Sequence, residues 1–385
     1  MLQINVLSVL LLAEATQSIV LAACLWWASS NRTANRILAL LILSFAVYMT
    51  PYIIGYAGAY DRWPWLSFAP FNVTLLFGPL LLAYTMTLTG VRPQPDWWWH
   101  LAPGAVQFLA QALVFPVPLE TKNWWNGAFH EPLVMPIFKM ATVVSLSAYG
   151  WLSWRRYRAY RSWLEQNRAD GPAFEPRWIR NALIAVMIAG GLWLGFAIAK
   201  LIDPSRNYFD EFWLYVGIGL LAIYLGVEGW RHARSAFPVM ESAGDEGEDM
   251  PTGSSGTSDR DWQQQAAAWA REVDRLGLWR DPEISLATMA RALGTNSNYL
   301  SRALNEGLGV NFHAFVNQRR IAAIKELLAD PVERRDLMSL AFDVGFNSKA
   351  SFNRVFADSV GLTPSAYRRS LAPKAQAGDA DLGRR

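Results

Sequence analysis

The chain contains 385 residues, of which 52% are hydrophobic, 13% aromatic and only 17% charged. This composition excludes a disordered or collagen-like chain, and the single cysteine, Cys24, excludes an intramolecular disulfide scaffold. The net charge of +3 is unevenly distributed: residues 1–238 carry 17 Lys and Arg against 12 Asp and Glu, whereas residues 239–261 carry one against seven. The length and this contrast predict two or three folding units of different character.

Seven apolar runs, each about 20–25 residues long, recur in the first 238 residues. A helix of this length spans the roughly 30 Å of hydrocarbon in a bilayer. Because lipid offers no partner to backbone N–H and C=O groups, such runs must close their hydrogen bonds internally as helices. We therefore expect an all-α fold with a seven-helix transmembrane bundle, and a soluble helical core is the alternative. The predicted spans are 4–28, 37–59, 66–88, 99–119, 132–154, 179–202 and 211–230.

Basic residues predict the orientation of this bundle, because cytoplasmic connections are enriched in Lys and Arg. One set of alternate connections, together with the exit after the seventh span, carries 11 Arg, and the opposite set carries three Lys or Arg. The first set is therefore expected in the cytoplasm. The N-terminus would then lie outside, and everything after residue 231 would lie inside.

Polar side chains within the predicted spans are candidates for a sensing site. Charged and polar groups at membrane depth are costly unless they are paired, and they often mark functional sites. We expect Glu14 to pair with Lys139. Two interpretations stay open, a polar clamp that orders the bundle and a site for a ligand or proton. The candidates are Glu14, Gln17, Gln107, Gln111 and Lys139.

Residues 239–261 are rich in Gly, Ser and acidic residues, and they contain almost no apolar side chains. Such a segment cannot bury a core, so we expect an acidic flexible linker. A flexible chain of this length has an r.m.s. reach of roughly 26 Å. Residues 372–385 are expected to form a polar tail.

Residues 262–371 contain two copies of one pattern, offset by 52 residues. In each copy a short helix (286–293 or 337–344) precedes a glycine, a polar capping stretch and a second helix with apolar residues at spacing four. Helix, tight turn and helix is the DNA-binding helix-turn-helix, whose second helix enters the major groove. Residues 311–329 are expected to form one helix that joins the two copies.

Two sequence strings resemble the AraC family of bacterial transcription regulators: NYLSRALNEGLG at 298–309 and GFNSKASFNRVFADSVGLTPSAYRR at 345–369. The resemblance covers about 110 residues, and Ala350 departs from the polar residue that many relatives carry there. It implies two recognition helices that contact double-stranded DNA. The residues that the resemblance assigns to this contact are Asn298, Ser301 and Arg302 in the first helix, and Lys349, Ser351, Asn353 and Arg354 in the second.

The resemblance and the apolar runs together predict a one-component transcription regulator in the bacterial inner (plasma) membrane. The bundle would sense an unknown small-molecule or envelope signal, and the C-terminal domain would bind promoter DNA. The alternatives are a membrane transporter or membrane enzyme with a regulatory tail, and a passive membrane anchor for a transcription factor.

Catalytic and cofactor motifs are absent from the sequence, which lacks CxxC, a phosphate loop, GxSxG and HExxH. We therefore expect neither an enzyme nor a bound cofactor or metal. The net charge of residues 262–371 is modest for a DNA-binding domain, which favours a homodimer or adjacent operator sites. Residues 262–276 carry a short apolar stripe that either packs on its own domain or pairs two chains.

Overall fold

The computed structural model describes residues 5–91, 93, 95–169, 176–203, 210–234, 237–238, 240, 262–330 and 332–371. Within these residues all regular secondary structure is helical, which confirms the expected all-α fold. The chain divides into two compact units, Met1–Tyr160 with Pro176–Met240 (unit 1) and Arg161–Glu175 with Glu241–Arg385 (unit 2). The predicted polar tail and nearly all of the predicted acidic linker lie outside the described residues.

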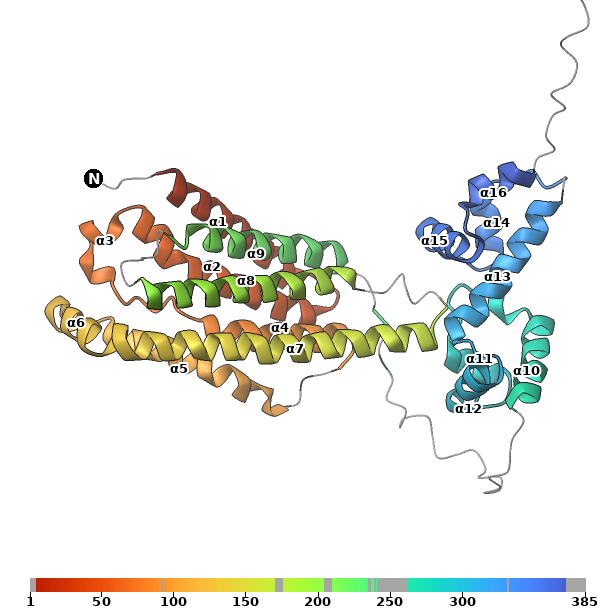
Figure 1. Ribbon diagram of the computed structural model, residues 1–385, viewed down its shortest axis with the longest axis horizontal. Coiled ribbons are helices and arrows are strands. Elements are labelled where there is room, and N and C mark those ends of the chain that lie inside the picture. Colours follow the sequence, from red (N-terminus) through yellow and green to blue (C-terminus); the bar gives the residue numbers. More distant parts are fainter. Residues whose placement is uncertain are drawn as a thin grey trace, which may run out of the picture. The chain divides into compact units, whose positions relative to one another are not determined.

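Each of the seven predicted spans contains a helix (Figure 1). These helices are α1 (Val6–Trp27), α2 (Arg32–Tyr56), α4 (Phe77–Leu88), α5 (Ala102–Val114), α7 (Met135–Asn167), α8 (Arg177–Ile202) and α9 (Phe212–His232). Shorter segments connect them: α3 (Ala59–Arg62), α6 (Leu119–Trp125), the 3-10 turns η1 (Pro64–Leu66), η2 (Thr74–Leu76) and η3 (Pro95–Leu101), and the π-helical η4 (Asn126–Val134).

Five helices in the described residues are long and apolar enough to cross a membrane: Val6–Trp26, Arg32–Tyr56, Leu119–Asn167, Arg177–Ala199 and Phe212–His232. Helices α4 and α5 have 12 and 13 residues, which corresponds to about 18–20 Å at 1.5 Å per residue. Both are short because the chain before each of them forms 3-10 turns instead of α-helix. The count of seven spans therefore stays a prediction.

Helix α7 extends beyond the span expected at 132–154, into a stretch that we expected to be a loop. Its continuation has a packed face, because Tyr157 and Tyr160 are almost completely buried. The Tyr160 hydroxyl also donates a hydrogen bond of 2.9 Å to the carbonyl of Pro238. The residues of α7 from Arg161 onward belong to unit 2.

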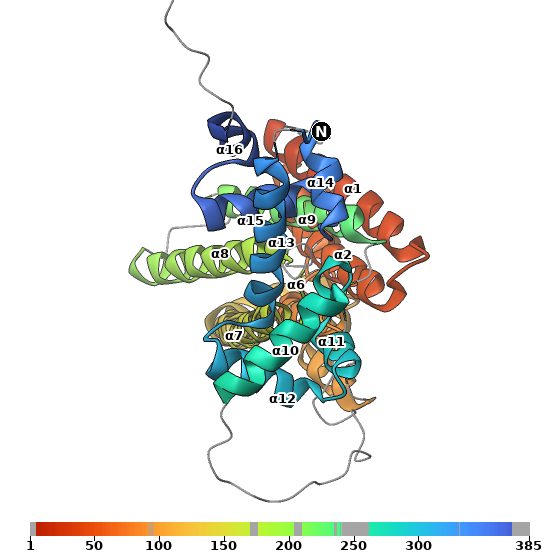
Figure 2. The same ribbon diagram turned by 90° about the vertical axis from the view of Figure 1, so that its right-hand side faces the viewer.

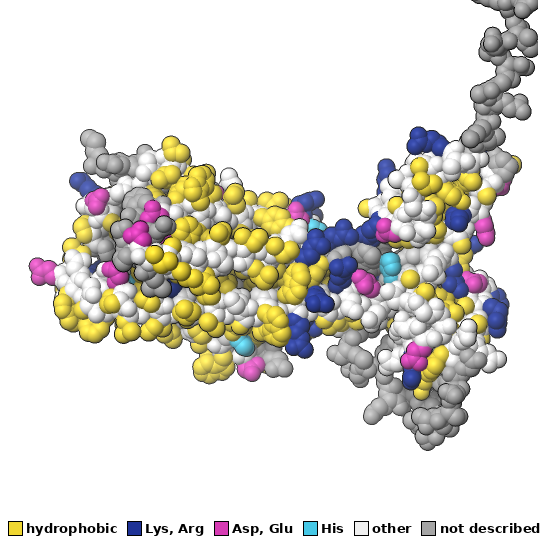
Figure 3. Space-filling view, in the orientation of Figure 1, with side chains coloured by type: hydrophobic (Ala, Val, Ile, Leu, Met, Phe, Trp, Pro, Cys, Tyr) yellow, Lys and Arg dark blue, Asp and Glu magenta, His cyan; other side chains and the backbone are white. Residues whose placement is uncertain are grey.

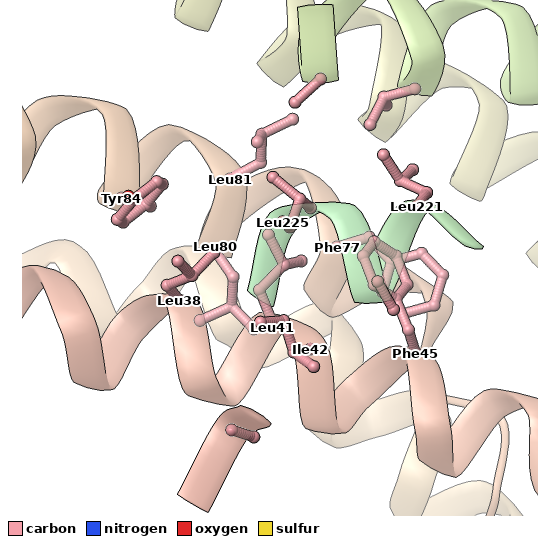
Figure 4. Packing of buried hydrophobic residues seen from close by; sticks show 14 of the residues in the cluster. Leu38, Leu41, Ile42, Phe45, Phe77, Leu80, Leu81, Tyr84, Leu221 and Leu225 are labelled. Atoms are coloured by element: carbon pink, nitrogen blue, oxygen red, sulfur yellow. The ribbon is translucent and has the colours of Figure 1, made fainter. Parts of the chain in front are cut away.

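The core of unit 1 lies where α2, α4 and α9 meet (Figure 4). Leu38 and Leu41 of α2 are fully buried, and the rings of Phe45 and Phe77 are 4.5 Å apart in an edge-to-face contact. A β-carbon at Gly229 would lie 2.3 Å from Leu38, so this glycine is what allows α9 to approach α2.

The outer faces of the unit 1 helices are apolar as well, and hydrophobic side chains cover much of the surface seen in Figure 3. Met140 and Val144 of α7 and Ile188 of α8 are each about 60% exposed. A helix that is apolar on both its packed and its outer faces is typical of a membrane span. These faces therefore indicate that unit 1 associates with a membrane.

In unit 2, the helix α13 (Phe312–Ala329) runs between two groups of shorter helices (Figure 2). The first group contains α10 (Trp262–Leu276), η6 (Leu278–Arg280), α11 (Leu286–Ala292), α12 (Ser297–Arg302) and the π-helical η7 (Ala303–Gly307). The second group contains α14 (Leu337–Asp343), α15 (Lys349–Val360) and α16 (Pro364–Leu371). Asn311 caps α13, as the sequence predicts for a single helix joining the two copies.

Arg320 of α13 lies inside the core of unit 2 and is only 1% exposed. Its Nε atom donates a hydrogen bond of 2.8 Å to the carbonyl of Trp279, and Nη2 donates one of 2.7 Å to the carbonyl of Asp281. The guanidinium also lies 5.6 Å from the ring centroid of Phe346. A single side chain thus links α13 to the segment before α11 and to the turn after α14.

Replacing Arg320 with Met is expected to destabilise unit 2 by about 2–4 kcal/mol, because the carbonyls of Trp279 and Asp281 lose charged donors. Hydrogen exchange of peptides from residues 262–371, measured on the full chain in detergent, tests this value. The matched control is Lys325→Met, since Lys325 is exposed on the same helix. Equal protection in both variants would contradict the role given to Arg320.

Candidate nucleic-acid interface and polar sites of the bundle

The two copies in unit 2 begin their helices in the same way. Asn296 caps α12 by accepting a 2.9 Å hydrogen bond from the N–H of Tyr299, and Ser348 caps α15 by accepting one of 3.2 Å from the N–H of Ser351. The turn before each cap contains a glycine with positive φ, 67° at Gly294 and 93° at Gly345. The same arrangement of turn and cap therefore starts the second helix of each helix-turn-helix motif, although the capping residue is Asn in one copy and Ser in the other.

In the first motif, the residues of α12 and η7 that anchor the segment in the core differ from those that are candidates for DNA contact. Leu300 and Leu304 are buried in the core of unit 2. Asn298 and Arg302 are exposed, and Ser301 is half-buried. The three side chains assigned to DNA by the family resemblance therefore all remain accessible in the structure.

Arg302 is held by two neighbours that the sequence reasoning missed. Its Nε atom donates a hydrogen bond of 2.9 Å to Glu306, and its guanidinium lies 4.9 Å from the ring centroid of Trp262. The ring of Trp262 is stacked on Tyr299 at 6.3 Å. The i,i+4 spacing of Arg302 and Glu306 was a usable sequence signal for the ion pair.

Gly307 allows α10 to lie this close to the first recognition helix. A β-carbon at Gly307 would be 2.2 Å from the carbonyl oxygen of Trp262, a distance that backbone atoms cannot tolerate. The apolar stripe of α10 packs in the same region, with Ala266 and Val273 fully buried. Helix α10 therefore uses its apolar stripe within its own unit.

In the second motif, α15 presents Lys349 and Asn353 as exposed side chains and Arg354 as a half-buried one. Phe352 and Phe356 anchor the helix in the core. Ser351 is only 6% exposed, so it lies on the packed side of α15 and is not on the accessible face.

Ion pairs and caps fix the start of the second motif. Arg335 pairs with Glu333 at 2.7 Å and also with Asp343, and hydrogen bonds from Arg335 lower the pKa of Glu333 to about 2. Asp336 caps α14, and the hydrogen bonds from Ser339 lower the pKa of its carboxyl. These four side chains carry one positive charge against three negative charges, so they add nothing to the attraction of unit 2 for phosphates.

Two of the polar candidates in unit 1 stabilise the irregular backbone before α4. Gln107 is almost completely buried, and its Oε1 atom accepts a hydrogen bond of 3.1 Å from the N–H of Leu75. Its Nε2 atom donates to Asn72 at 3.0 Å and to Thr74 at 3.1 Å. The Oε1 atom of Gln111 accepts a 2.9 Å hydrogen bond from the N–H of Asn72. Both glutamines therefore hold the segment before α4.

Glu14 does not form the expected pair with Lys139. The helix that carries Glu14, α1, packs against α2 and α9, and a β-carbon at Gly219 of α9 would lie 2.2 Å from the Glu14 carboxylate. The Oε2 atom of Glu14 is buried and makes no hydrogen bond to any described residue. Gln17 is exposed on α1.

Lys139 is half-buried and instead lines a cavity of about 500 Å³. Gln107 and Gln111 line the same cavity, so the structure brings three of the five candidates together and leaves Glu14 and Gln17 elsewhere. Sequence reasoning missed Tyr52, Glu211 and Tyr215, which also line it, because they come from α2 and from the start of α9.

Comparison with known proteins identifies only the C-terminal part of the chain. Residues 289–370 match a family described as a helix-turn-helix domain. An uncharacterized HTH-type transcriptional regulator of Staphylococcus aureus (strain COL) is 35% identical over 95 residues, which cover 25% of this chain and 12% of that protein. Regulatory protein PocR of Salmonella typhimurium (strain LT2) is 28% identical over 89 residues, which cover 23% of this chain and 29% of PocR.

These relatives are matched over only a small part of their own length, and no solved structure matches the chain. The matched residues contain both capped motifs and the helix α13 between them. The resemblance to the AraC family is therefore confirmed for this part of the chain, and residues 289–370 form an AraC-type helix-turn-helix domain, a domain of DNA-binding transcription regulators.

Proposed function

We propose that this chain is a membrane-embedded one-component transcription regulator. Unit 2 binds promoter DNA sequence-specifically, and unit 1 senses a signal in the inner membrane of a bacterium or outside it. The observation that carries the proposal is the joining, in one chain, of an AraC-type domain to five helices with the length and composition of membrane spans.

The geometry of unit 2 suits the reading of two neighbouring DNA segments. Helix α13 has 18 residues and is about 27 Å long, which is comparable to the roughly 34 Å between successive major-groove segments on one DNA face. Arg302 and Arg354 can each form two hydrogen bonds with guanine, and Asn298 and Asn353 can do so with adenine. Ser301 and Lys349 can contact bases or phosphates.

The apolar outer faces of the unit 1 helices support a location of this unit in the membrane. The arginines near the predicted inner ends of the spans favour an N-terminus outside and unit 2 in the cytoplasm. The signal acts by population shift: it binds one packing of the bundle more tightly than another, and that difference sets how much DNA-competent protein is present.

The double variant Arg302→Ala/Arg354→Ala is expected to bind its preferred sites at least about 30-fold more weakly, since each bidentate base contact contributes about 1–3 kcal/mol of discrimination. Genome-wide occupancy of the full chain would identify the sites, and titration of those DNA fragments with purified protein in nanodiscs would give the affinities. Lys325→Ala is the control. Unchanged affinity and site choice in the double variant would refute specific reading by these arginines.

The Glu306→Gln variant is expected to bind DNA more tightly, by roughly three- to tenfold, because a carboxylate that competes with phosphates for Arg302 is neutralised. Fold stability should change little, since the exposed pair contributes about 0–1 kcal/mol. Titrations at low and high salt check the electrostatic origin, because the gain should shrink as salt rises.

Glu272→Gln is the matched control, because Glu272 forms an exposed pair with Arg275 on α10. Weaker DNA binding by Glu306→Gln alone would show that Glu306 positions Arg302 for DNA and does not compete with it.

A further inference from the structure

The cavity in unit 1 has the size of a binding site for a small molecule. Its volume of about 500 Å³ lies within the roughly 300–1,000 Å³ that is usual for ligand pockets. Residues from α2, α3, α5, α6, η4, α7, α8 and α9 and from the segment before α4 line it.

Aromatic rings form much of the cavity wall. Tyr52 of α2 and Tyr215 of α9 are stacked with ring centroids 3.6 Å apart. On another part of the wall, Phe68 lies edge-to-face against both Trp125 and His130, at 5.4 Å and 5.0 Å. A ring face that is not covered by a neighbouring ring is flat and apolar, and such a face also attracts cations.

The irregular segment before α4 also points to a bound molecule. At membrane depth, non-helical backbone is tolerated where it is buried in protein or lines a cavity, and interrupted helices at such depth commonly form binding sites. Asn72 and Thr74 belong to this segment and line the cavity. Gln107 and Gln111 hold the backbone of this segment by hydrogen bonds.

A cation and a carboxylate line the cavity from different elements. Lys139 of α7 makes no hydrogen bond or ion pair with any residue in the described part of the chain. Gln111 lines the same cavity, and its Oε1 atom accepts a hydrogen bond from the N–H of Asn72, which leaves the amide N–H₂ as a donor. Glu211, at the start of α9, accepts a hydrogen bond of 2.6 Å from the hydroxyl of Tyr215.

We propose that this cavity binds a small zwitterion with an apolar body, which is the chemistry of an amino acid or a short peptide. Its carboxylate lies at Lys139 and Gln111, its ammonium lies at Glu211 and the ring of Tyr52, and its apolar body contacts the ring cluster of Phe68. Binding of such a molecule is the signal in the sensing role proposed above, on which this assignment rests.

Charge decides between a zwitterion and a simpler ligand. A singly charged molecule would pair with only one of the two side chains, Lys139 or Glu211. It would also displace water from the unpaired side chain, and the loss of those hydrogen bonds is costly. A second carboxylate, Glu131, also lines the cavity and is exposed, which further disfavours a plain anion. A zwitterion satisfies both charges and adds no net charge.

The test compares matched probes on the full chain in nanodiscs by isothermal titration. One set is L-tryptophan, tryptamine and indole-3-propionate, and the other is L-leucine, isoamylamine and 4-methylpentanoate. At least one amino acid is expected to bind tenfold or more tightly than both of its singly charged analogues.

Two variants test which side chain binds each charged group of the ligand. Lys139→Met is expected to abolish the preference for the amino acid over the amine, and Glu211→Gln is expected to abolish the preference over the carboxylate. Gln17→Leu, on the exposed face of α1, is the control and should leave both preferences intact. The proposal would be overturned if neither amino acid bound more tightly than both of its singly charged analogues, or if neither amino acid bound at all.

Failure of this proposal can be distinguished from failure of the proposed function. Probe binding should be unchanged in the Arg302→Ala/Arg354→Ala variant, because it depends on unit 1 alone. Amino acid binding without any effect on DNA occupancy would contradict the sensing role while leaving the zwitterion site in place.

Discussion

In the membrane location proposed for unit 1, the hydrogen bonding of the backbone is the constraint on which the rest of the unit depends. A peptide group without a partner in hydrocarbon costs several kcal/mol, so apolar runs must form helices, and any interruption must be satisfied by side chains. Before α4 the chain forms a 3-10 turn, and the amides of Gln107 and Gln111 accept hydrogen bonds from the backbone of Leu75 and Asn72. Asn72 and Thr74 of this interrupted segment also line the cavity.

Unit 2 meets a different constraint, since it must expose polar side chains on short helices and still hold those helices in fixed positions. The caps at Asn296 and Ser348 start the recognition helices, and the glycines before them reverse the chain. Arg320 holds α13 in place by hydrogen bonds to the carbonyls of Trp279 and Asp281. The accessible side chains of α12 and α15 can therefore vary with little effect on the fold.

Local signals in the sequence predicted much of the fold. Helix caps, glycine turns and apolar spacing depend on residues that are close in the chain, which is why the two motifs and α13 were found within a few residues of their bounds. The helical bundle followed from the apolar runs for the same reason. The lengths of α4 and α5 did not, because the 3-10 turns before them are stabilised by side chains from other helices.

The candidate sites were predicted less completely, because they depend on contacts between distant residues. Ser351 and Asn353 are both polar residues in one helix, and only packing shows that the first is buried. Glu14 and Lys139 have opposite charges, but α1 packs against α9 and the expected pair does not form. The cavity combines residues from Tyr48 to Tyr215, and spacing in the sequence could not reveal that combination.

The proposed function requires that the two units occupy different solvents, with unit 1 in the bilayer and unit 2 in the cytoplasm. Single cysteines placed in a Cys24→Ser background test this most directly, at Glu120 in a predicted outer connection and at Asn305 in unit 2, both of which are exposed. In intact spheroplasts, a membrane-impermeant maleimide is expected to label the cysteine at position 120 at once and the one at 305 only after lysis. Labelling of position 305 in unbroken spheroplasts, or release of the chain from vesicles by alkaline carbonate, would contradict the account.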